Sequence, residues 1–409
     1  WDTDCNAGNV GAIMGVAVGL AGIPDHWLEP MNDVLVLSSN IGARNLTDIP
    51  ACADLFIRLG RQVAGLPAEP AKARYHFDYP GATQGFLGGG ERVTVVDIRN
   101  QPAPEREGRA LRFSVRKLEK KGNLRLYVKT YYAAGDLSAN FYGASFSPKI
   151  YPGQSLRASL YLPPDSPTGL LGALYAAGTR GEVLQAPGQP LHPGQWNELT
   201  FTLPAGESVY VAEVGAVIRH EIDAGWTGSI WLDDLDWDGQ PDVHFDFKKA
   251  KAEYGAISQW TYLRGYWRLQ DGAYHGSGPG INETYSGDVA WKDTTLTVDL
   301  IPLLGSHHLI SARVQGALRS YAFGVSPDVT VTLYKNAGGY HALASAPFEL
   351  KPGQSYTLRL DCKGNHITGE VNGIRLVDWV DTDKPYLNAQ IGLVNFGGCH
   401  TRYTSVHAS

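Results

Sequence analysis

The sequence has little charge, few sulfur-containing residues and no long apolar run. Asp, Glu, Lys and Arg make up 19% of its 409 residues, and the formal net charge is −6. This balance gives no reason to expect a nucleic-acid partner, since proteins that bind nucleic acids concentrate basic residues. Because no stretch of about 18 uninterrupted apolar residues occurs, we expect no membrane span. Methionine occurs only twice, and sequons at Asn45 and Asn282 fit an exported protein, so we expect a secreted or cell-surface location.

What the chain does contain is enough apolar residues to build cores. Hydrophobic residues make up 43%, alongside 48 glycines, 24 prolines, 10 tryptophans and 21 tyrosines. This composition excludes disorder over most of the length. At roughly 150 residues per domain, the length predicts two or three domains. We place them at residues 1–70, 74–240 and 242–409, with an Ala-Glu-Pro-Ala-Lys-Ala linker at 68–73 and a Gly-Gln-Pro-Asp boundary at 239–242.

The first 70 residues have a helical pattern. Between residues 7 and 23 glycines recur every three or four positions, and the remaining positions are apolar on the other faces. A second helix is expected at 49–63, with Thr47 or Asp48 as N-cap and Gly65 near its end. A helix that is apolar all round must be buried on all sides, and one further helix cannot cover it. We therefore expect this segment to be the end of a larger helical domain or to dock on a neighbouring subunit. Since the sequence opens at Trp1 without Met, we expect a processed, truncated or nicked product.

From Tyr75 onward, apolar and polar residues alternate with a period of two. The alternation is clear at 111–116, 124–129 and 199–203, and again at 296–300, 329–333 and 356–360. Strands with one solvent-exposed face and one buried face favour antiparallel sheets packed as sandwiches. Asn372-Gly373 is a strong signal for a type I′ hairpin. The expected fold is thus multidomain, with a short all-α remnant followed by two antiparallel β-sandwiches.

The most specific segment stands immediately before the glycine-rich helix, and it reads Trp1-Asp2-Thr3-Asp4-Cys5-Asn6-Ala7-Gly8. Carboxylates at a helix N-terminus can serve as capping acids stabilised by the helix dipole. The alternative is a site for a hard cation such as Mg²⁺, which prefers oxygen ligands. Spacing alone leaves both interpretations of Asp2 and Asp4 open.

Four features follow one another here: Asp2-Thr3-Asp4-Cys5-Asn6-Ala7-Gly8, the glycine-rich helix, Ile23-Pro24-x-x-Trp27 and Pro30-x-Asn32-Asp33. Together they resemble the C-terminal part of ADP-ribosylglycohydrolase-type enzymes over residues 1 to about 66. The resemblance implies an all-helical hydrolase domain with a two-magnesium centre, in which Asp2 and Asp4 are metal ligands. Where the family often has Thr or Ser as a further ligand, this chain has Cys5, and a thiol is a poor ligand for Mg²⁺. The family's earlier acidic motif has no counterpart in residues 34–409, so the resemblance implies a chain with half a metal site and no activity alone.

The middle segment opens with His76-Phe77-Asp78-Tyr79 and closes with Ile230-Trp231-Leu232-Asp233-Asp234-Leu235-Asp236-Trp237. These ends resemble the first and last strands of jelly-roll carbohydrate-binding modules. Such modules often hold a structural Ca²⁺ between those strands, which implies Asp78 and Asp234 as ligands. The alternative is a solvated acidic strand end formed by the aspartates at 233, 234, 236 and 238.

The last segment contains Phe245-Asp246-Phe247, Trp267-Arg268-Leu269-Gln270-Asp271-Gly272 and Ile391-Gly392-Leu393-Val394. These stretches resemble concanavalin-like or laminin-G-like sandwiches. Aromatic rings gather between residues 260 and 291, and their faces can stack on sugars. Trp260, Trp267 and Tyr274 are therefore candidates for carbohydrate binding, and the alternative is that they form core.

Two of the four cysteines, Cys362 and Cys399, lie in strand segments of the last domain that look adjacent. We expect a disulfide between them, the alternative being four free thiols.

Two functions from different classes fit these patterns. The first is an exported, magnesium-dependent glycosyl-bond hydrolase of ADP-ribosylglycohydrolase type, of which this chain is the C-terminal part and whose sandwiches hold a glycan or glycoside. The second is a non-catalytic extracellular protein that binds sugar or assembles into a filament or surface layer. An additional segment with acidic residues that complete the site around Asp2 and Asp4 would favour the first.

Overall fold

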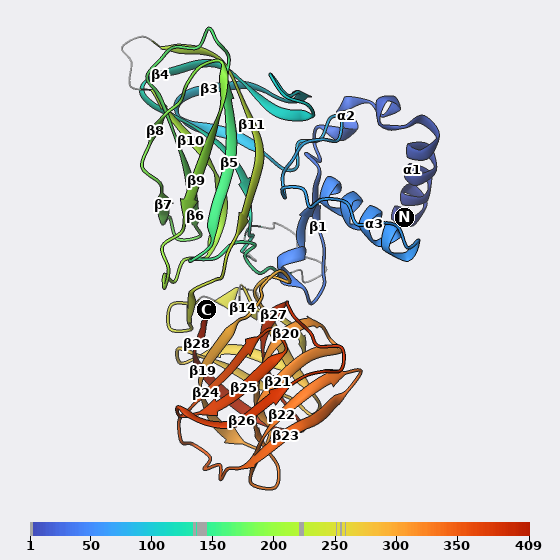
Figure 1. The fold of residues 1–409 in the computed structure, drawn as a ribbon, viewed down its shortest axis with the longest axis vertical. Helices are drawn as coiled ribbons and strands as arrows, with labels where there is room; N and C mark the ends of the chain where they lie inside the picture. Colours follow the sequence, from blue (N-terminus) through green and yellow to red (C-terminus); the bar gives the residue numbers. More distant parts are fainter. Residues whose placement is uncertain are drawn as a thin grey trace.

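The computed structural model describes residues 3–133, 136, 145–220, 225–250, 252–253, 256–257 and 259–409. A helical N-terminal segment lies beside the first of two β modules, and the second β module follows at the end of the chain (Figure 1). Within the described part, no helix has the length and hydropathy needed to cross a membrane.

Both helices expected in the N-terminal segment are present. They are α1 (Asp4–Val18) and α3 (Ile49–Val63). The Asp48 carboxylate caps α3 by accepting a hydrogen bond from the Ala51 amide at 2.9 Å. Gly65 follows the end of the helix with a φ of 67°, a left-handed conformation that glycine adopts without strain. The shorter elements between the two helices are η1 (Leu20–Gly22), α2 (Asp25–Leu28), β1 (Val34–Val36), η2 (Gly42–Arg44) and β2 (Leu46–Asp48).

The helix α1 has no buried residue. Its apolar side chains face solvent, with Ile13 68% and Val16 91% exposed. In Figure 1 the helix lies apart from both β modules, at the right of the view. The sequence-based inference that this segment cannot cover its own apolar helix is therefore confirmed.

The middle module is one nine-stranded sheet that bends around its own core. The long strand β4 makes the bend, because residues 111–118 pair with β11 while residues 123–129 pair with β10. The alternating apolar residues of β4, such as Leu111, Phe113 and Leu124, are fully buried, as the period-two pattern predicted. The strands are β3 (Leu87–Pro102), β4 (Arg109–Lys129), β5 (Ser155–Leu162), β6 (Leu170–Gly178), β7 (Val183–Gln185), β8 (Gln189–Pro190), β9 (Gln195–Thr202), β10 (Val211–His220) and β11 (Trp226–Asp238).

The C-terminal module packs an eight-stranded sheet on a seven-stranded sheet, and their inner faces share one core. The first sheet contains β12 (Val243–Asp246), β16 (Tyr266–Gln270), β17 (Ala273–Ser277), β19 (Thr295–Leu304), β24 (Tyr356–Lys363), β25 (His366–Val371), β26 (Ile374–Val380) and β28 (His400–Ala408). The second contains β15 (Thr261–Arg264), β18 (Asn282–Ser286), β20 (His308–Gly316), β21 (Arg319–Ser326), β22 (Thr330–Ala337), β23 (Tyr340–Pro347) and β27 (Gln390–Asn395). Two short strands, β13 (Ala252–Glu253) and β14 (Ala256–Ile257), pair with each other in antiparallel fashion.

The hairpin between β25 and β26 confirms the expected turn, because Asn372 and Gly373 have φ values of 51° and 79°.

The two β modules share an aromatic contact. Tyr151 of the middle module packs against Phe245 and, at a ring-centroid distance of 4.8 Å, against Trp291 of the C-terminal module. The Tyr151 hydroxyl also accepts a hydrogen bond from the Gly287 amide at 3.2 Å. This buried side chain therefore fixes the junction between the modules.

Candidate functional site

Of the two carboxylates predicted to bind magnesium, Asp4 is the first residue of α1, and Asp2 lies outside the described residues. Oδ1 of Asp4 accepts a hydrogen bond from the Cys5 amide at 2.7 Å, and both residues are exposed. Mg²⁺ requires near-octahedral oxygen coordination. Asp4 supplies only part of such a ligand set, so magnesium binding by Asp2 and Asp4 stays a prediction.

The N-terminal segment is clamped to the middle module by Asp33. Its Oδ2 accepts hydrogen bonds from the amides of Thr83 at 2.6 Å and Gln84 at 2.9 Å. Asn32 adds a second contact by donating from its side chain to the Phe86 carbonyl at 3.1 Å. These polar contacts therefore fix the position of the N-terminal segment on the middle module.

A second contact joins α3 to the start of the middle module. Asp54 Oδ2 lies 2.9 Å from His76 Nε2, and its Oδ1 accepts a hydrogen bond from the Tyr79 hydroxyl at 2.6 Å. Burial works to raise the pKa of Asp54, but the hydrogen bonds from Tyr79 and His76 outweigh it and hold this pKa below its usual value. The carboxylate thus stays charged and fastens α3 to the module.

A cavity of about 250 Å³ lies between the N-terminal segment and the middle module. Its polar and apolar lining comes from both parts, and includes Asn32, Val34, Asp48, Tyr75, Gln84 and Lys149. Burial lowers the pKa of Lys149 to about 8 and raises the pKa of Asp48. No pattern in the sequence indicated this cavity, because its polar groups come from segments about 100 residues apart.

The two aspartates predicted to bind calcium each lie beside a basic side chain. Tyr75 and Leu235 form a β-bridge, so the start of the middle module neighbours its last strand as expected. The Asp78 carboxylate lies 3.1 Å from Lys72 Nζ, and the Asp234 carboxylate lies 3.3 Å from Arg106 Nη2, which also pairs with Asp233. Both carboxylates are about half exposed, and calcium binding by this pair stays a prediction.

The three predicted sugar-binding aromatics are core residues. Trp260 and Tyr274 are 1% exposed and Trp267 is 5% exposed, so none offers a free ring face. They pack on one another and on neighbours such as Phe247. The alternation of inward and outward side chains along each strand would have distinguished core rings from surface rings. Within β16, for example, Trp267 points inward while its neighbour Tyr266 is 61% exposed.

The predicted disulfide between Cys362 and Cys399 is not formed, and all four cysteines of the chain are free. Cys362 lies in β24 and Cys399 immediately precedes β28, and strand β19 lies between these two strands. Moreover, Asp361 pairs with Thr295 at one end of β19, whereas His400 pairs with Leu304 at the other. Nine residues of strand separate these ends by about 30 Å, far beyond the roughly 7 Å limit between Cα atoms for a disulfide.

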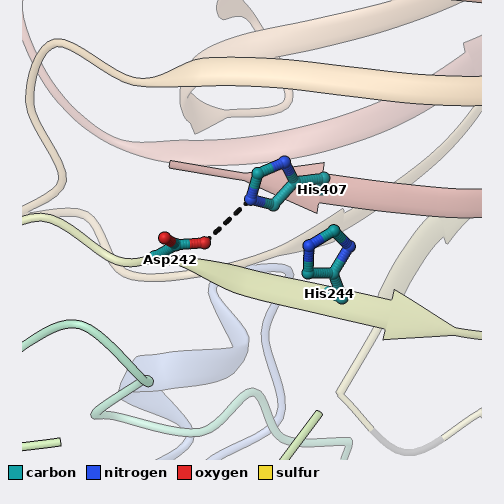
Figure 2. Close-up of side chains that lie close together, drawn as sticks. All are labelled: Asp242, His244 and His407. Atoms are coloured by element: carbon teal, nitrogen blue, oxygen red, sulfur yellow. Dashed lines mark hydrogen bonds and ion pairs between the residues drawn. The ribbon is translucent and has the colours of Figure 1, made fainter. Parts of the chain in front are cut away.

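One cluster of three metal-ligating side chains occurs among the described residues, and it was not predicted. It consists of Asp242, His244 and His407, whose ligand atoms all lie within 4.8 Å of one another. Figure 2 shows the three side chains side by side, where the first strand of the C-terminal module pairs with the last. Asp4, Asp78 and Asp234 do not belong to it.

Comparison with known proteins bears on the N-terminal segment first. Residues 1–62 match the ADP-ribosylglycohydrolase family model. This match confirms the resemblance found in the opening motif, over about the same residues. No curated protein matches the chain.

Several solved structures are similar to part of the chain. The carbohydrate-binding module CBM66 from Bacillus subtilis is 17% identical, with 36% of this chain and 94% of that chain covered and a TM-score of 0.33. A β-glucanase from Bacillus licheniformis is 14% identical, with 41% and 97% covered and a TM-score of 0.32. The galectin LEC-6 from Caenorhabditis elegans is 16% identical, with 39% and 99% covered and a TM-score of 0.26. At these identities the likeness concerns the β-sandwich fold alone.

Proposed function

We propose that this chain is the C-terminal part of an exported, metal-dependent glycosyl-bond hydrolase of ADP-ribosylglycohydrolase type, whose β modules hold a glycan. The observation that carries the proposal is the combination of the family match at residues 1–62 with an apolar helix α1 that has no cover. A helix of this kind requires burial on all sides. The remaining helices of a hydrolase domain would provide it.

In a complete helical domain, Asp2 and Asp4 would supply carboxylate oxygens to Mg²⁺. The ion would activate water and stabilise the developing charge at the sugar carbon. Cys5, which stands where the family often has a hydroxyl, would not ligate the ion, because a thiolate is a soft ligand. The contribution of this chain is to hold Asp4 at the start of α1 and to dock that segment on the middle module through Asp33 and Asp54.

The cavity between the N-terminal segment and the middle module is our candidate for a glycan subsite. Its volume of about 250 Å³ suits a small ligand such as one sugar ring. Asn32, Gln84 and Lys149 offer polar groups, and Tyr75 and Val34 offer apolar surface. Sugar recognition needs both kinds of contact.

The test is to join residues 1–409 to an N-terminal helical portion that carries the family's earlier acidic motif. We expect Mg²⁺-dependent hydrolysis of ADP-ribosyl conjugates or aryl glycosides by the completed protein and none by the chain alone. Asp4→Asn should abolish turnover, and Glu29→Gln, an exposed change elsewhere in the N-terminal segment, should leave it intact. A folded, completed protein that turns over no substrate of either class would refute the proposal.

The non-catalytic alternative rests on the same open helix, since a second copy of the chain could cover α1. Sedimentation of the 409-residue chain distinguishes the two. Concentration-dependent assembly that Val16→Asp abolishes, together with an inactive completed protein, would support the assembly function. A monomeric chain would remove its main support.

A further inference from the structure

The cluster of Asp242, His244 and His407 is built by the pairing of the first and last strands of the C-terminal module. In the register of β12 with β28, His244 lies directly opposite His407. The flanking residues Val243 and Phe245 point into the core, so the two imidazoles lie on the outer face of the sheet. Asp242 immediately precedes β12, and its carboxylate reaches the same face (Figure 2).

The three side chains are already in contact. His407 Nε2 lies 2.8 Å from Asp242 Oδ1. The rings of His244 and His407 stack with centroids 4.0 Å apart and an angle of 4° between their planes. Two nitrogen donors and one oxygen donor therefore lie close together on the outer face of the sheet.

We propose that Asp242, His244 and His407 form a zinc site. Zinc binds imidazole nitrogen and carboxylate oxygen at about 2.0–2.2 Å, in a tetrahedron whose ligand atoms lie about 3.4 Å apart. The ligand atoms here lie within 4.8 Å of one another before any ion is present. The exposed His244 ring can tilt out of the stack to close the remaining distance, because an ion must lie in the plane of each ring that binds it. Water would complete the tetrahedron.

The chemistry of the three ligands suits zinc, because Zn²⁺ accepts both imidazole nitrogen and carboxylate oxygen. The mixed nitrogen and oxygen set also selects against Mg²⁺ and Ca²⁺, which prefer oxygen ligands throughout.

The position of the cluster gives the ion a structural role. The Asp242 amide donates to the Pro152 carbonyl at 2.8 Å, and the Asp242 carbonyl accepts from the Gly206 amide at 2.9 Å. The Ser208 hydroxyl donates to the His244 carbonyl at 2.9 Å. The backbone that carries the ligands is thus already bound to two loops of the middle module. An ion held there would fasten the final strand β28 to the junction between the modules.

The experiment is a zinc titration of the metal-free 409-residue chain by calorimetry, followed by a Co²⁺ titration read by visible absorption. We expect one equivalent to bind, with a tetrahedral Co²⁺ spectrum and a raised melting temperature. Loss of an outer-shell partner costs about 10–100-fold in metal affinity, so loss of the ligand His244 in His244→Ala should weaken binding by more than 100-fold. Mg²⁺ and Ca²⁺ should not compete.

The matched control is His366→Ala. His366 forms an exposed pair with Asp378 at 2.7 Å in the same module but belongs to no three-ligand cluster of the described residues. This variant should bind zinc like the unchanged chain. Because His244 is exposed, His244→Ala should melt at the same temperature as the unchanged chain when zinc is absent. Absence of saturable binding at one equivalent, or equal affinity in His244→Ala, would overturn the proposal.

Discussion

Replacing Asp33 should loosen the N-terminal segment from the middle module without unfolding the module. The carboxylate accepts hydrogen bonds from the amides of Thr83 and Gln84, at 2.6 and 2.9 Å, and lies 3.3 Å from the Thr83 hydroxyl. Hydrogen bonds to a charged group contribute about 1.5–3 kcal/mol each, against about 0.5–1.5 for neutral pairs. In Asp33→Asn the amide oxygen can still accept, so the two backbone bonds together should lose about 2 kcal/mol.

Asp33→Ala should cost more, about 3–5 kcal/mol, because both bonds disappear. The residue also has a φ of 59°, in the left-handed region that Asn tolerates and Ala does not. Asp33→Asn should therefore destabilise the contact less than Asp33→Ala, because Asn keeps the backbone conformation and loses only the charge.

The assay is amide hydrogen exchange over residues 32–54, where a loss of about 2 kcal/mol should raise the opening equilibrium about 30-fold. Exchange in the core strand β10 should stay unchanged. The control is Glu29→Ala, which removes only an exposed ion pair with Arg99 at 3.9 Å and should have little effect. Unchanged exchange over residues 32–54 in Asp33→Ala would refute the role of the clamp.

Three further predictions concern the C-terminal module and the cysteines. Trp260→Ala should lower the free energy of unfolding of the module by about 3–5 kcal/mol in urea, because the ring is buried in its core. A decrease below about 1 kcal/mol would contradict this core position. Alkylation of the denatured, unreduced chain should modify all four thiols. Modification of only two thiols would show that a disulfide is present. Burial lowers the pKa of His308 from 6.5 to about 4, so its stability contribution is full above pH 6.5 and is lost as the pH falls towards 4. That loss reaches about 3 kcal/mol, and urea midpoints at pH 7 and 4.5 should differ less in His308→Gln than in the unchanged chain.

Local patterns predicted the local structure well. The alternation that places Leu111 and Phe113 in the core is a property of one strand, and the cap that Asp48 provides to α3 is a property of four consecutive residues. The positive φ values at Asn372 and Gly373 likewise follow from the turn itself. Each of these features depends on residues that are close in the sequence, so the sequence alone could predict them.

The wrong disulfide and the missed metal-ligand cluster share a physical origin, which is strand order. Cys362 and Cys399 looked adjacent because both stand near strands of one module, but β19 lies between those strands. The zinc cluster was missed for the same reason, because His244 and His407 meet only when the first strand pairs with the last. The aromatic prediction failed differently, since a count of rings between residues 260 and 291 ignored which face of the strand each ring occupies.

The N-terminal segment combines a part that is docked on the middle module with a helix whose apolar surface is uncovered. Residues 32–54 are held on the middle module through Asp33 and Asp54, whereas α1, only 14 residues before Asn32, has no buried residue. A segment that merely lacked a function would have no reason to keep a helix apolar on every face, since such a surface promotes aggregation. The middle module therefore acts as a fixed support for residues 32–54, and the apolar surface of α1 stays open to a covering partner. A covering helical domain would bury that surface without displacing the contacts of Asp33 and Asp54, so docking on the sandwich and completion of the helical domain are compatible.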